Sequence, residues 1–368
     1  MPASDVAVVG GGVIGCAVAY YLAQAGVRVA VFERDTVGCE ASGAAAGMLA
    51  PLSEAHGPGP FLDLCLASLR LFPALSEGLR QETGIDIEYT ASGLLRLAFT
   101  EAEEAEINGR WDWQRSLELE RLSGEEVRAL EPALSPKVRC ALYSPVEHQV
   151  SAGRLVQALA RGAQLRGAAL YQGEPVLGLV ARGQRVVGLR TARGSVAAGH
   201  VVLAAGPWLA DLGRRLGVRL PVRPVRGQLL ALGGMSPPIR HIVWSSRGYL
   251  TPKANGLIFA GTTVEEVGFR KGTTARAIAR LRRMAATLVP PLAYAQVTSA
   301  WAGLRPASAD SRPILGPLPG WEGVSVAGGH FRNGILLAPM TGRLMAQLIA
   351  NGATEFPIDP FSPARFGP

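Results

Sequence analysis

The stretch Val6–Arg34, VAVVGGGVIGCAVAYYLAQAGVRVAVFER, decides the fold of this chain of 368 residues. An apolar run and a glycine-rich turn come first, followed by a helix-like segment, Cys16–Ala25, and a second apolar run, Val27–Phe32. The order of strand, tight turn, helix and strand predicts a βαβ unit, and glycines at this spacing are typical of units that bind a dinucleotide. The alternative is an ordinary βαβ unit with a glycine-rich turn.

Each glycine in the turn has its own physical role. Gly10 permits a sharp turn, Gly12 lets the backbone approach a pyrophosphate, and Gly15 lets the helix pack closely on the strand. The helix N-terminus then offers free N–H groups and a partial positive charge to the phosphates. Glu33 follows roughly 20 residues later, where a carboxylate accepts hydrogen bonds from ribose hydroxyls and disfavours a 2′-phosphate.

The composition restricts the class of protein. A hydrophobic share of 48% and a charged share of 18% are typical of a folded globular protein. The length suits two domains, or one large domain with an insertion. The net charge of +8 comes from arginines scattered along the chain. Scattered charge argues against a nucleic-acid partner and favours a solvated basic surface, whose field also attracts small anions.

The cysteines and the N-terminus predict a cytoplasmic protein. The four cysteines form no CxxC pair and no metal-ligand spacing, so we expect reduced thiols and no metal site: Cys16, Cys39, Cys65 and Cys140. The N-terminus lacks the basic region of a signal peptide. Glycine and arginine interrupt the most apolar window, 13–32, which excludes it as a membrane span.

Further along the chain, helical and strand-like patterns alternate. We expect one helix over Phe61–Thr83, a strand at Ile85–Tyr89 and a poorly ordered tail from Phe356. Short strands with tight turns predict a β-meander: Pro175–Val180, Val186–Thr191 and Ser195–Ala197. The continuous apolar run after His200 reads as a buried parallel strand, and Ala205 and Gly206 at its carboxyl end leave room for a ligand.

The order of the elements predicts two discontinuous domains. Residues 1–84, 141–220 and 305–368 would form the nucleotide-binding domain. Residues 85–140 and 221–304 would form a second, mostly antiparallel domain over the carboxyl edge of the parallel sheet.

Three polar side chains stand at the ends of apolar strands, next to glycine or proline: Tyr249, Arg305 and Arg332. An arginine fork can hold a carboxylate through two parallel hydrogen bonds, and a phenol can donate a third. A substrate carboxylate is one possible partner for the arginines, and a structural salt bridge is the alternative, with Asp310 as a candidate partner of Arg305.

His330 invites interpretation as a general base, but we favour a ring held in a glycine-rich turn. The chain has no GxSxG, no HExxH and no paired cysteine or histidine site. The sequence therefore shows no protein nucleophile or metal, and difficult chemistry would have to come from a cofactor.

Six motifs, spread from residue 6 to residue 342, resemble one family: VVGGGVIGCAVAYYLAQAG, SGAAAGMLAP, VVLAAGPW, PVRGQ, WAGLRP and AGGHFRNGILLAPMTG. The chain resembles the FAD-dependent D-amino-acid oxidase and sarcosine oxidase superfamily, and most closely its glycine-oxidase-like branch, which serves thiamine biosynthesis. The resemblance implies an α/β fold. A Rossmann-like FAD-binding domain of the glutathione-reductase type, with a parallel sheet and a β-meander, would carry an α+β substrate domain built on an antiparallel sheet.

The resemblance also implies the cofactor and its contacts. Relatives with covalent flavin use a cysteine near the last glycine-rich turn, and no cysteine lies there, so we expect non-covalent FAD. The residues expected to bind FAD are Gly10, Gly12, Val13, Ile14, Gly15, Glu33, Arg34, Ala41, Ser42, Ala46, Gly47, Met48, Val176, Ala205, Gly206, Gly329, His330, Phe331, Arg332, Asn333, Gly334, Ile335 and Leu336.

By the same resemblance, Tyr249, Arg305 and Arg332 form the catalytic and substrate-binding set. Arg247 and Val264 stand where relatives place a histidine and a methionine near the substrate. The implied reaction is oxidative deamination of glycine, sarcosine or small D-amino acids. Molecular oxygen is the acceptor, and the products are an oxo acid, ammonia or an amine, and hydrogen peroxide. Family members often form tetramers.

Two alternatives to the oxidase stay open at this point. A dehydrogenase of the same fold would pass electrons to a quinone or a partner protein. A non-catalytic or RNA-associated flavoprotein would fit the basic charge, although the scattered arginines argue against it.

Overall fold

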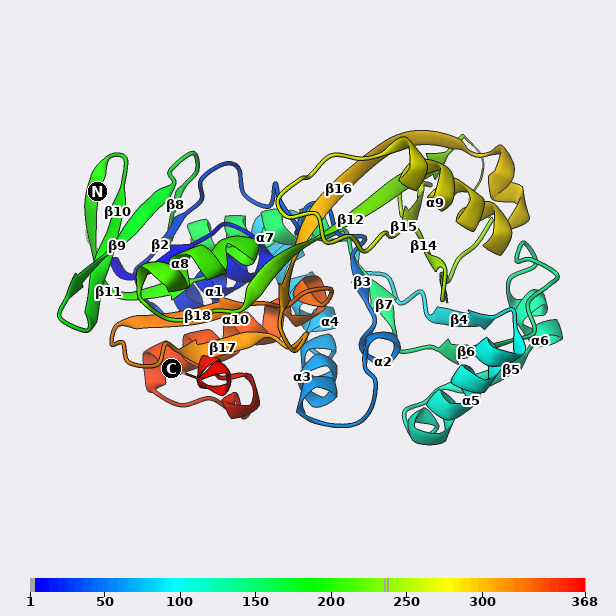
Figure 1. The fold of residues 1–368 in the computed structure, drawn as a ribbon, viewed down its shortest axis with the longest axis horizontal. Helices are drawn as coiled ribbons and strands as arrows, with labels where there is room; N and C mark the ends of the chain where they lie inside the picture. Colours follow the sequence, from blue (N-terminus) through cyan, green and yellow to red (C-terminus); the bar gives the residue numbers. More distant parts are fainter. Residues whose placement is uncertain (1–3, 235, 237, 368) are drawn as a thin grey trace.

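The computed structural model describes residues 4–234, 236 and 238–367, with two eight-stranded sheets and one two-stranded sheet (Figure 1). The α-helices are α1 Val13–Gln24, α2 Pro51–Glu54, α3 Pro60–Leu69, α4 Phe72–Thr83, α5 Glu101–Gln114, α6 Gly124–Leu130, α7 Ala152–Leu165, α8 Leu209–Arg215, α9 Ala275–Leu288 and α10 Gly334–Asn351. Short 3₁₀ helices are η1 Gly206–Trp208, η2 Pro290–Tyr294, η3 Asp359–Phe361 and η4 Pro363–Phe366.

The first sheet has the order β17-β18-β11-β1-β2-β8, with β9 and β10 attached through β11. Its strands are β1 Ser4–Val9, β2 Val29–Phe32, β8 Ala169–Tyr171, β9 Val176–Arg182, β10 Arg185–Thr191, β11 Gly194–Leu203, β17 Ile314–Pro317 and β18 Val324–Gly328. Its central strand, β1, pairs in parallel with both β2 and β11. Val6 and Val8 pack among α1, α7 and α10, whereas Ala7 and Val9 pack toward the meander and α8. Both faces of the sheet are therefore covered, which explains the continuous apolar strand sequences.

The predicted β-meander is present, but its last strand is longer than expected. β11 runs from Gly194 to Leu203 as one strand and joins two predicted strands. Its first half, 194–197, pairs antiparallel with β10, and its second half, 198–203, pairs in parallel with β1. One strand thereby connects the meander to the parallel sheet.

The second sheet has the order β16-β12-β15-β14-β13-β4-β6-β5. Its strands are β4 Leu94–Ala98, β5 Glu120–Ser123, β6 Cys140–Ser144, β12 Val222–Gly233, β13 Ile242–Ser245, β14 Gly248–Pro252, β15 Ile258–Gly261 and β16 Gln296–Ser308. All its pairs are antiparallel except β13 with β4. The long strands β12 and β16 connect the two halves of the molecule, and the basic helix α9 covers one face of the second sheet (Figure 1).

Two strands of the second sheet run across the expected domain boundaries. β6 spans the boundary at 140/141, and β16 spans the boundary at 304/305. The division of the chain into the two sets of segments given above stays a prediction.

Three local predictions are wrong. Phe61–Thr83 forms two helices, α3 and α4, because Pro73 would clash with a preceding carbonyl inside a continuous helix. Ile85–Tyr89 forms no strand: Glu88 has a positive φ of 56°, and its N–H donates to Asp86 Oδ1 in a local turn. The tail from Phe356 is not poorly ordered as predicted, because it forms two short 3₁₀ helices and Phe361 is fully buried.

The remaining strands, β3 Met48–Leu49 and β7 His148–Gln149, form the two-stranded sheet beside the loop at 41–50. Within the described residues, no helix combines the length and the hydrophobicity that a membrane crossing requires. The four cysteines are all free thiols.

Candidate active site

A single long cavity runs from the glycine turn to the second sheet. One end is lined by the turn, by Glu33 and Arg34, and by residues after β11. The other end is lined by Tyr249, Thr262 and Arg305. The loop at 40–50 and the segment 327–335, which leads into α10, line the cavity between these ends. Residues far apart in the chain therefore form one continuous wall, as expected for an extended ligand.

The glycine turn has the predicted close approaches. A Cβ on Gly15 would lie 1.9 Å from the Gly10 carbonyl oxygen, and Gly10 itself has a φ of 110°. Gly12 is extended, and a Cβ there would meet only Ser42 Oγ, at 3.3 Å. Gly10 and Gly15 therefore shape the turn, whereas Gly12 leaves the cavity open beside the helix.

The donors along this wall fit a dinucleotide. The N-cap residues of α1 and α10, Gly12 and Asn333, form no side-chain hydrogen bond to their helices, and both N-termini lie on the cavity. Ser42 Oγ accepts the Val13 N–H at 3.0 Å, which leaves its own hydroxyl proton available to a phosphate. The N-terminus of α1 suits a pyrophosphate, and that of α10 suits the electron-rich carbonyl edge of a flavin ring.

At the nucleotide end, Glu33 is held in place by two backbone N–H groups, Gly11 at 2.6 Å and Asp35 at 3.0 Å. The Arg34 guanidinium lies 3.6 Å from the centroid of the Trp208 ring, and Trp208 stacks on Phe269. Trp208 was not among the residues predicted to bind the cofactor, although it ends the motif VVLAAGPW. The signal was an aromatic residue just after the predicted ligand-binding strand end.

Nearly all of the residues expected to bind FAD line this cavity. The exceptions are Gly15, Gly329 and Leu336. Gly15 faces the Gly10 carbonyl, and Leu336 is buried in the core beneath α10. The individual FAD contacts stay predictions.

Arg305 is held beside the cavity by hydrogen bonds to Thr262 and Thr263. Its Nη2 donates to Thr262 Oγ1 at 2.6 Å and its Nη1 to the Thr263 carbonyl at 3.3 Å. Within the described residues no carboxylate forms an ion pair with it, and the suggested partner Asp310 pairs instead with Arg365 at 2.8 Å. Burial lowers the pKa of Arg305 because desolvation disfavours the charged guanidinium, and an anion in the cavity would favour the charged form.

Glycines make room for this end of the site. A Cβ on Gly227 would lie 2.1 Å from Arg305 Nη1, and a Cβ on Gly261 would lie 2.5 Å from the Tyr249 ring. Burial raises the pKa of Tyr249, so its hydroxyl keeps its proton at neutral pH and can act as a hydrogen-bond donor.

Arg332 lines the same end but has a partner. Its Nε donates to Glu54 Oε1 at 2.8 Å, and its guanidinium lies 5.3 Å from the centroid of the Trp244 ring. Glu54 also lines the cavity. Arg332 is therefore salt-bridged and also lines the cavity, and its binding of a substrate carboxylate stays a prediction.

The His330 ring is fixed in place by burial and by a hydrogen-bond contact, as expected for a structural histidine and not for a general base. It is buried, its Nε2 lies 3.0 Å from Thr341 Oγ1, and burial lowers its pKa to about 3. A ring with such a low pKa is neutral at physiological pH and a weak base.

Arg247 and Val264 lie outside the cavity wall. Arg247 is exposed and lies over Phe99, and the Val264 side chain is 58% exposed. Their expected contact with substrate stays a prediction.

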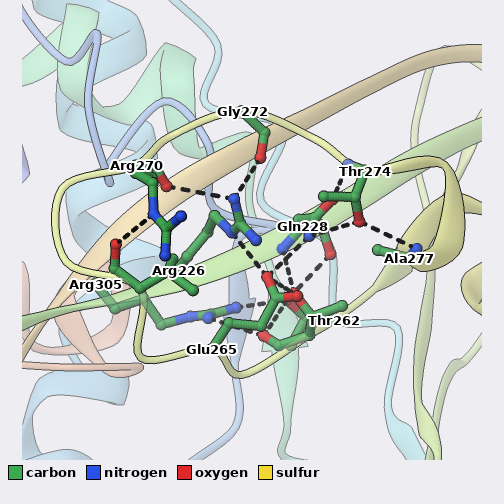
Figure 2. A network of polar contacts seen from close by, with 11 residues as sticks. Arg226, Gln228, Thr262, Glu265, Arg270, Gly272, Thr274, Ala277 and Arg305 are labelled. Carbon is green, nitrogen blue, oxygen red and sulfur yellow. Dashed lines mark hydrogen bonds and ion pairs between the residues drawn. The ribbon is translucent and has the colours of Figure 1, made fainter.

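A polar network lies behind Arg305 (Figure 2). Glu265 Oε2 accepts three hydrogen bonds, from Arg226 Nε at 2.8 Å, Gln228 Nε2 at 2.8 Å and Thr263 Oγ1 at 3.1 Å. The Gln228 N–H donates to Thr263 Oγ1 at 3.0 Å. The network fixes the segment whose Thr262 hydroxyl and Thr263 carbonyl hold Arg305, and it assigns a role to the PVRGQ motif.

Comparisons with known proteins agree with this geometry. Residues 5–348 match the family model described as FAD dependent oxidoreductase. The chain belongs to this family. It is 40% identical to the glycine oxidase of Geobacillus kaustophilus over 98% of this chain and 97% of that protein. It is 37% identical to the bifunctional protein ThiO/ThiG of Synechocystis sp., over 99% of this chain and 54% of that protein.

Solved structures show the same fold. The crystal structure of glycine oxidase from Geobacillus kaustophilus superposes with a TM-score of 0.96 at 39% identity, over 99% of both chains. The predicted fold class and the predicted FAD cofactor are thereby confirmed.

Proposed function

We propose that this FAD-dependent oxidoreductase is a glycine oxidase, which deaminates glycine, sarcosine or other small amino acids with oxygen as the acceptor. The observation that carries the proposal is Arg305, a partly buried cation on the cavity wall whose guanidinium forms no ion pair within the described residues. Tyr249 lines the same end with a protonated hydroxyl. Together they suit one small carboxylate.

Bound FAD supplies the two-electron acceptor for a hydride from the substrate α-carbon. The chain's own residues position the substrate: the Arg305 fork fixes the carboxylate, and the Tyr249 hydroxyl donates a further hydrogen bond. The amine enters unprotonated, and water hydrolyses the resulting imine. Glycine, oxygen and water then give glyoxylate, ammonia and hydrogen peroxide, and His330 with its low pKa is not required as a base.

The purified protein is expected to be yellow and to release hydrogen peroxide with glycine and with sarcosine. Glycinamide, which lacks the carboxylate, is the matched control, and we expect its kcat/KM to be at least about 100-fold lower because the charge-assisted pair is lost. A peroxide-coupled assay measures all three compounds. Turnover of glycinamide at the rate of glycine would contradict the role of Arg305.

The same preparation separates an oxidase from a dehydrogenase. An oxidase turns over with oxygen at least as fast as with an artificial electron acceptor, whereas turnover with the artificial acceptor alone would favour the dehydrogenase.

We further propose a cytoplasmic enzyme of thiamine biosynthesis that assembles as a homo-tetramer. The similarity to ThiO/ThiG supports the pathway.

Glu265→Gln is expected to raise the KM for glycine about tenfold with little change in kcat, because a charged acceptor of three hydrogen bonds is replaced by a neutral amide. Glu266→Gln is the matched control, since the neighbouring carboxylate is exposed and pairs only with Arg223 in the described structure. Steady-state kinetics of both variants test the network. An unchanged KM in Glu265→Gln would show that Arg305 does not depend on it.

A further inference from the structure

Glu54 is a charged residue of the cavity wall that the proposed reaction does not use. It ends the four-residue helix α2 and lies at the same end of the cavity as Arg305, Tyr249 and Arg332. Its Oε1 accepts the Arg332 Nε–H at 2.8 Å, and the two side chains are only 15% and 25% exposed. An acidic group beside a site for an anionic substrate requires an explanation, because like charges repel at short range.

The segment that carries Glu54 is fixed from several sides. Glu147, which is buried, accepts hydrogen bonds from the Ser53 N–H and the Ser53 hydroxyl, both at 2.8 Å. Side chains of β4 and α5 donate to carbonyls of α2 and of Ala55, the residue after it: Arg96 to Ser53, Arg110 to Leu52 and Ala55, and Gln114 to Leu52. Such a frame holds the Glu54 carboxylate at one place on the cavity wall.

The charges at this end of the cavity can be counted. Arg305 is a cation with no ion pair within the described residues, Arg332 is a cation neutralised by Glu54, and Tyr249 is neutral. Burial lowers the pKa of Arg305, and the nearby charges of Arg332 and Glu54 lower and raise it, respectively. The net charge of +1 matches one carboxylate, and among the described residues that line this end no free cation remains for a second one.

We propose that Glu54 restricts the substrates of this site to amines with a single carboxylate, by holding Arg332 in an ion pair and repelling a second acidic group. The proposal rests on the proposed amino-acid oxidase function and adds to it the charge class of the substrate. Specificity of this kind comes from a repulsive group as much as from an attractive one. Removal of the Glu54 charge would leave Arg332 free to hold a second carboxylate.

The test compares sarcosine with iminodiacetate, which differs by a carboxylate on the N-methyl group. In Glu54→Gln, the ratio of kcat/KM for iminodiacetate to that for sarcosine is expected to rise at least about tenfold over the wild type. Glu54→Asp keeps the charge and should keep the wild-type ratio. The monoamide of iminodiacetate has the same size but lacks the second charge, so its kcat/KM relative to sarcosine should rise no more than about twofold in Glu54→Gln. A larger rise would show that the variant gains space and not a favourable charge, and it would overturn the proposal.

Binding without turnover gives a second readout. Methoxyacetate and diglycolate are the ether counterparts of sarcosine and iminodiacetate, and their dissociation constants follow from changes in flavin absorbance. In Glu54→Gln, the dissociation constant of diglycolate divided by that of methoxyacetate should fall at least about tenfold below the wild-type ratio. In the double variant that also carries Arg332→Gln, this ratio should return to about the wild-type ratio. An unchanged ratio in Glu54→Gln would overturn the proposal. If the wild type oxidises no amine but this ratio shifts, the glycine oxidase function fails while the charge filter stands.

Discussion

Arg305→Ala is expected to lower kcat/KM for glycine by about three orders of magnitude, mainly through KM, because removing one partner of a desolvated charge pair costs about 2–5 kcal/mol. The guanidinium forms hydrogen bonds to Thr262 and Thr263 and no ion pair in the described part of the chain, so its charge is available to the substrate. Steady-state peroxide kinetics give both constants.

Two further variants separate charge and shape from general damage. Arg305→Lys keeps the charge but loses the planar fork, and it should recover only part of the lost affinity. Arg282→Ala removes an exposed arginine on α9 and should leave the kinetics unchanged. A KM in Arg305→Ala within a few-fold of the wild type would show that the carboxylate binds elsewhere.

Gly12→Val is expected to weaken FAD binding by at least about 100-fold while the chain still folds, because the new side chain fills the space beside the α1 N-terminus where a pyrophosphate would lie. Gly12 is extended, with φ −74° and ψ 178°, so a valine meets no backbone strain there. Its Cβ would meet only the Ser42 hydroxyl. The purified variant should be colourless.

Circular dichroism measures whether Gly12→Val folds, and an FAD titration measures its affinity for the cofactor. Gly78→Ala is the matched control, since a Cβ on this α4 glycine meets nothing within 4 Å. It should retain both fold and colour. A Gly12→Val protein that stays yellow with wild-type affinity would contradict the placement of the cofactor.

The sequence predicted those features that local patterns determine. The βαβ unit and the β-meander follow from runs of apolar residues that end at turn-forming residues. Where a turn-forming residue competed with the apolar pattern, as at Pro73 and Asp86, the pattern alone gave the wrong element.

The residues that the sequence missed depend on pairing between distant segments. Glu54 meets Arg332 across 278 positions, and Thr262 meets Arg305 across 43. Glu54 follows the motif SGAAAGMLAP by three residues, but no local pattern predicts that it pairs with Arg332. Arg247 and Val264 were placed by resemblance alone, and the structure puts both outside the cavity wall.

The measurement that tests the central claim most directly is anaerobic mixing of the purified yellow protein with glycine or sarcosine, followed by flavin absorbance. If the cavity holds FAD within reach of a carboxylate fixed by Arg305, the flavin absorbance should bleach fully without oxygen, at a rate that saturates with substrate. In Arg305→Ala, half-saturation should need far more substrate. A flavin that stays oxidised with both compounds, or that bleaches equally well in Arg305→Ala, would contradict the account.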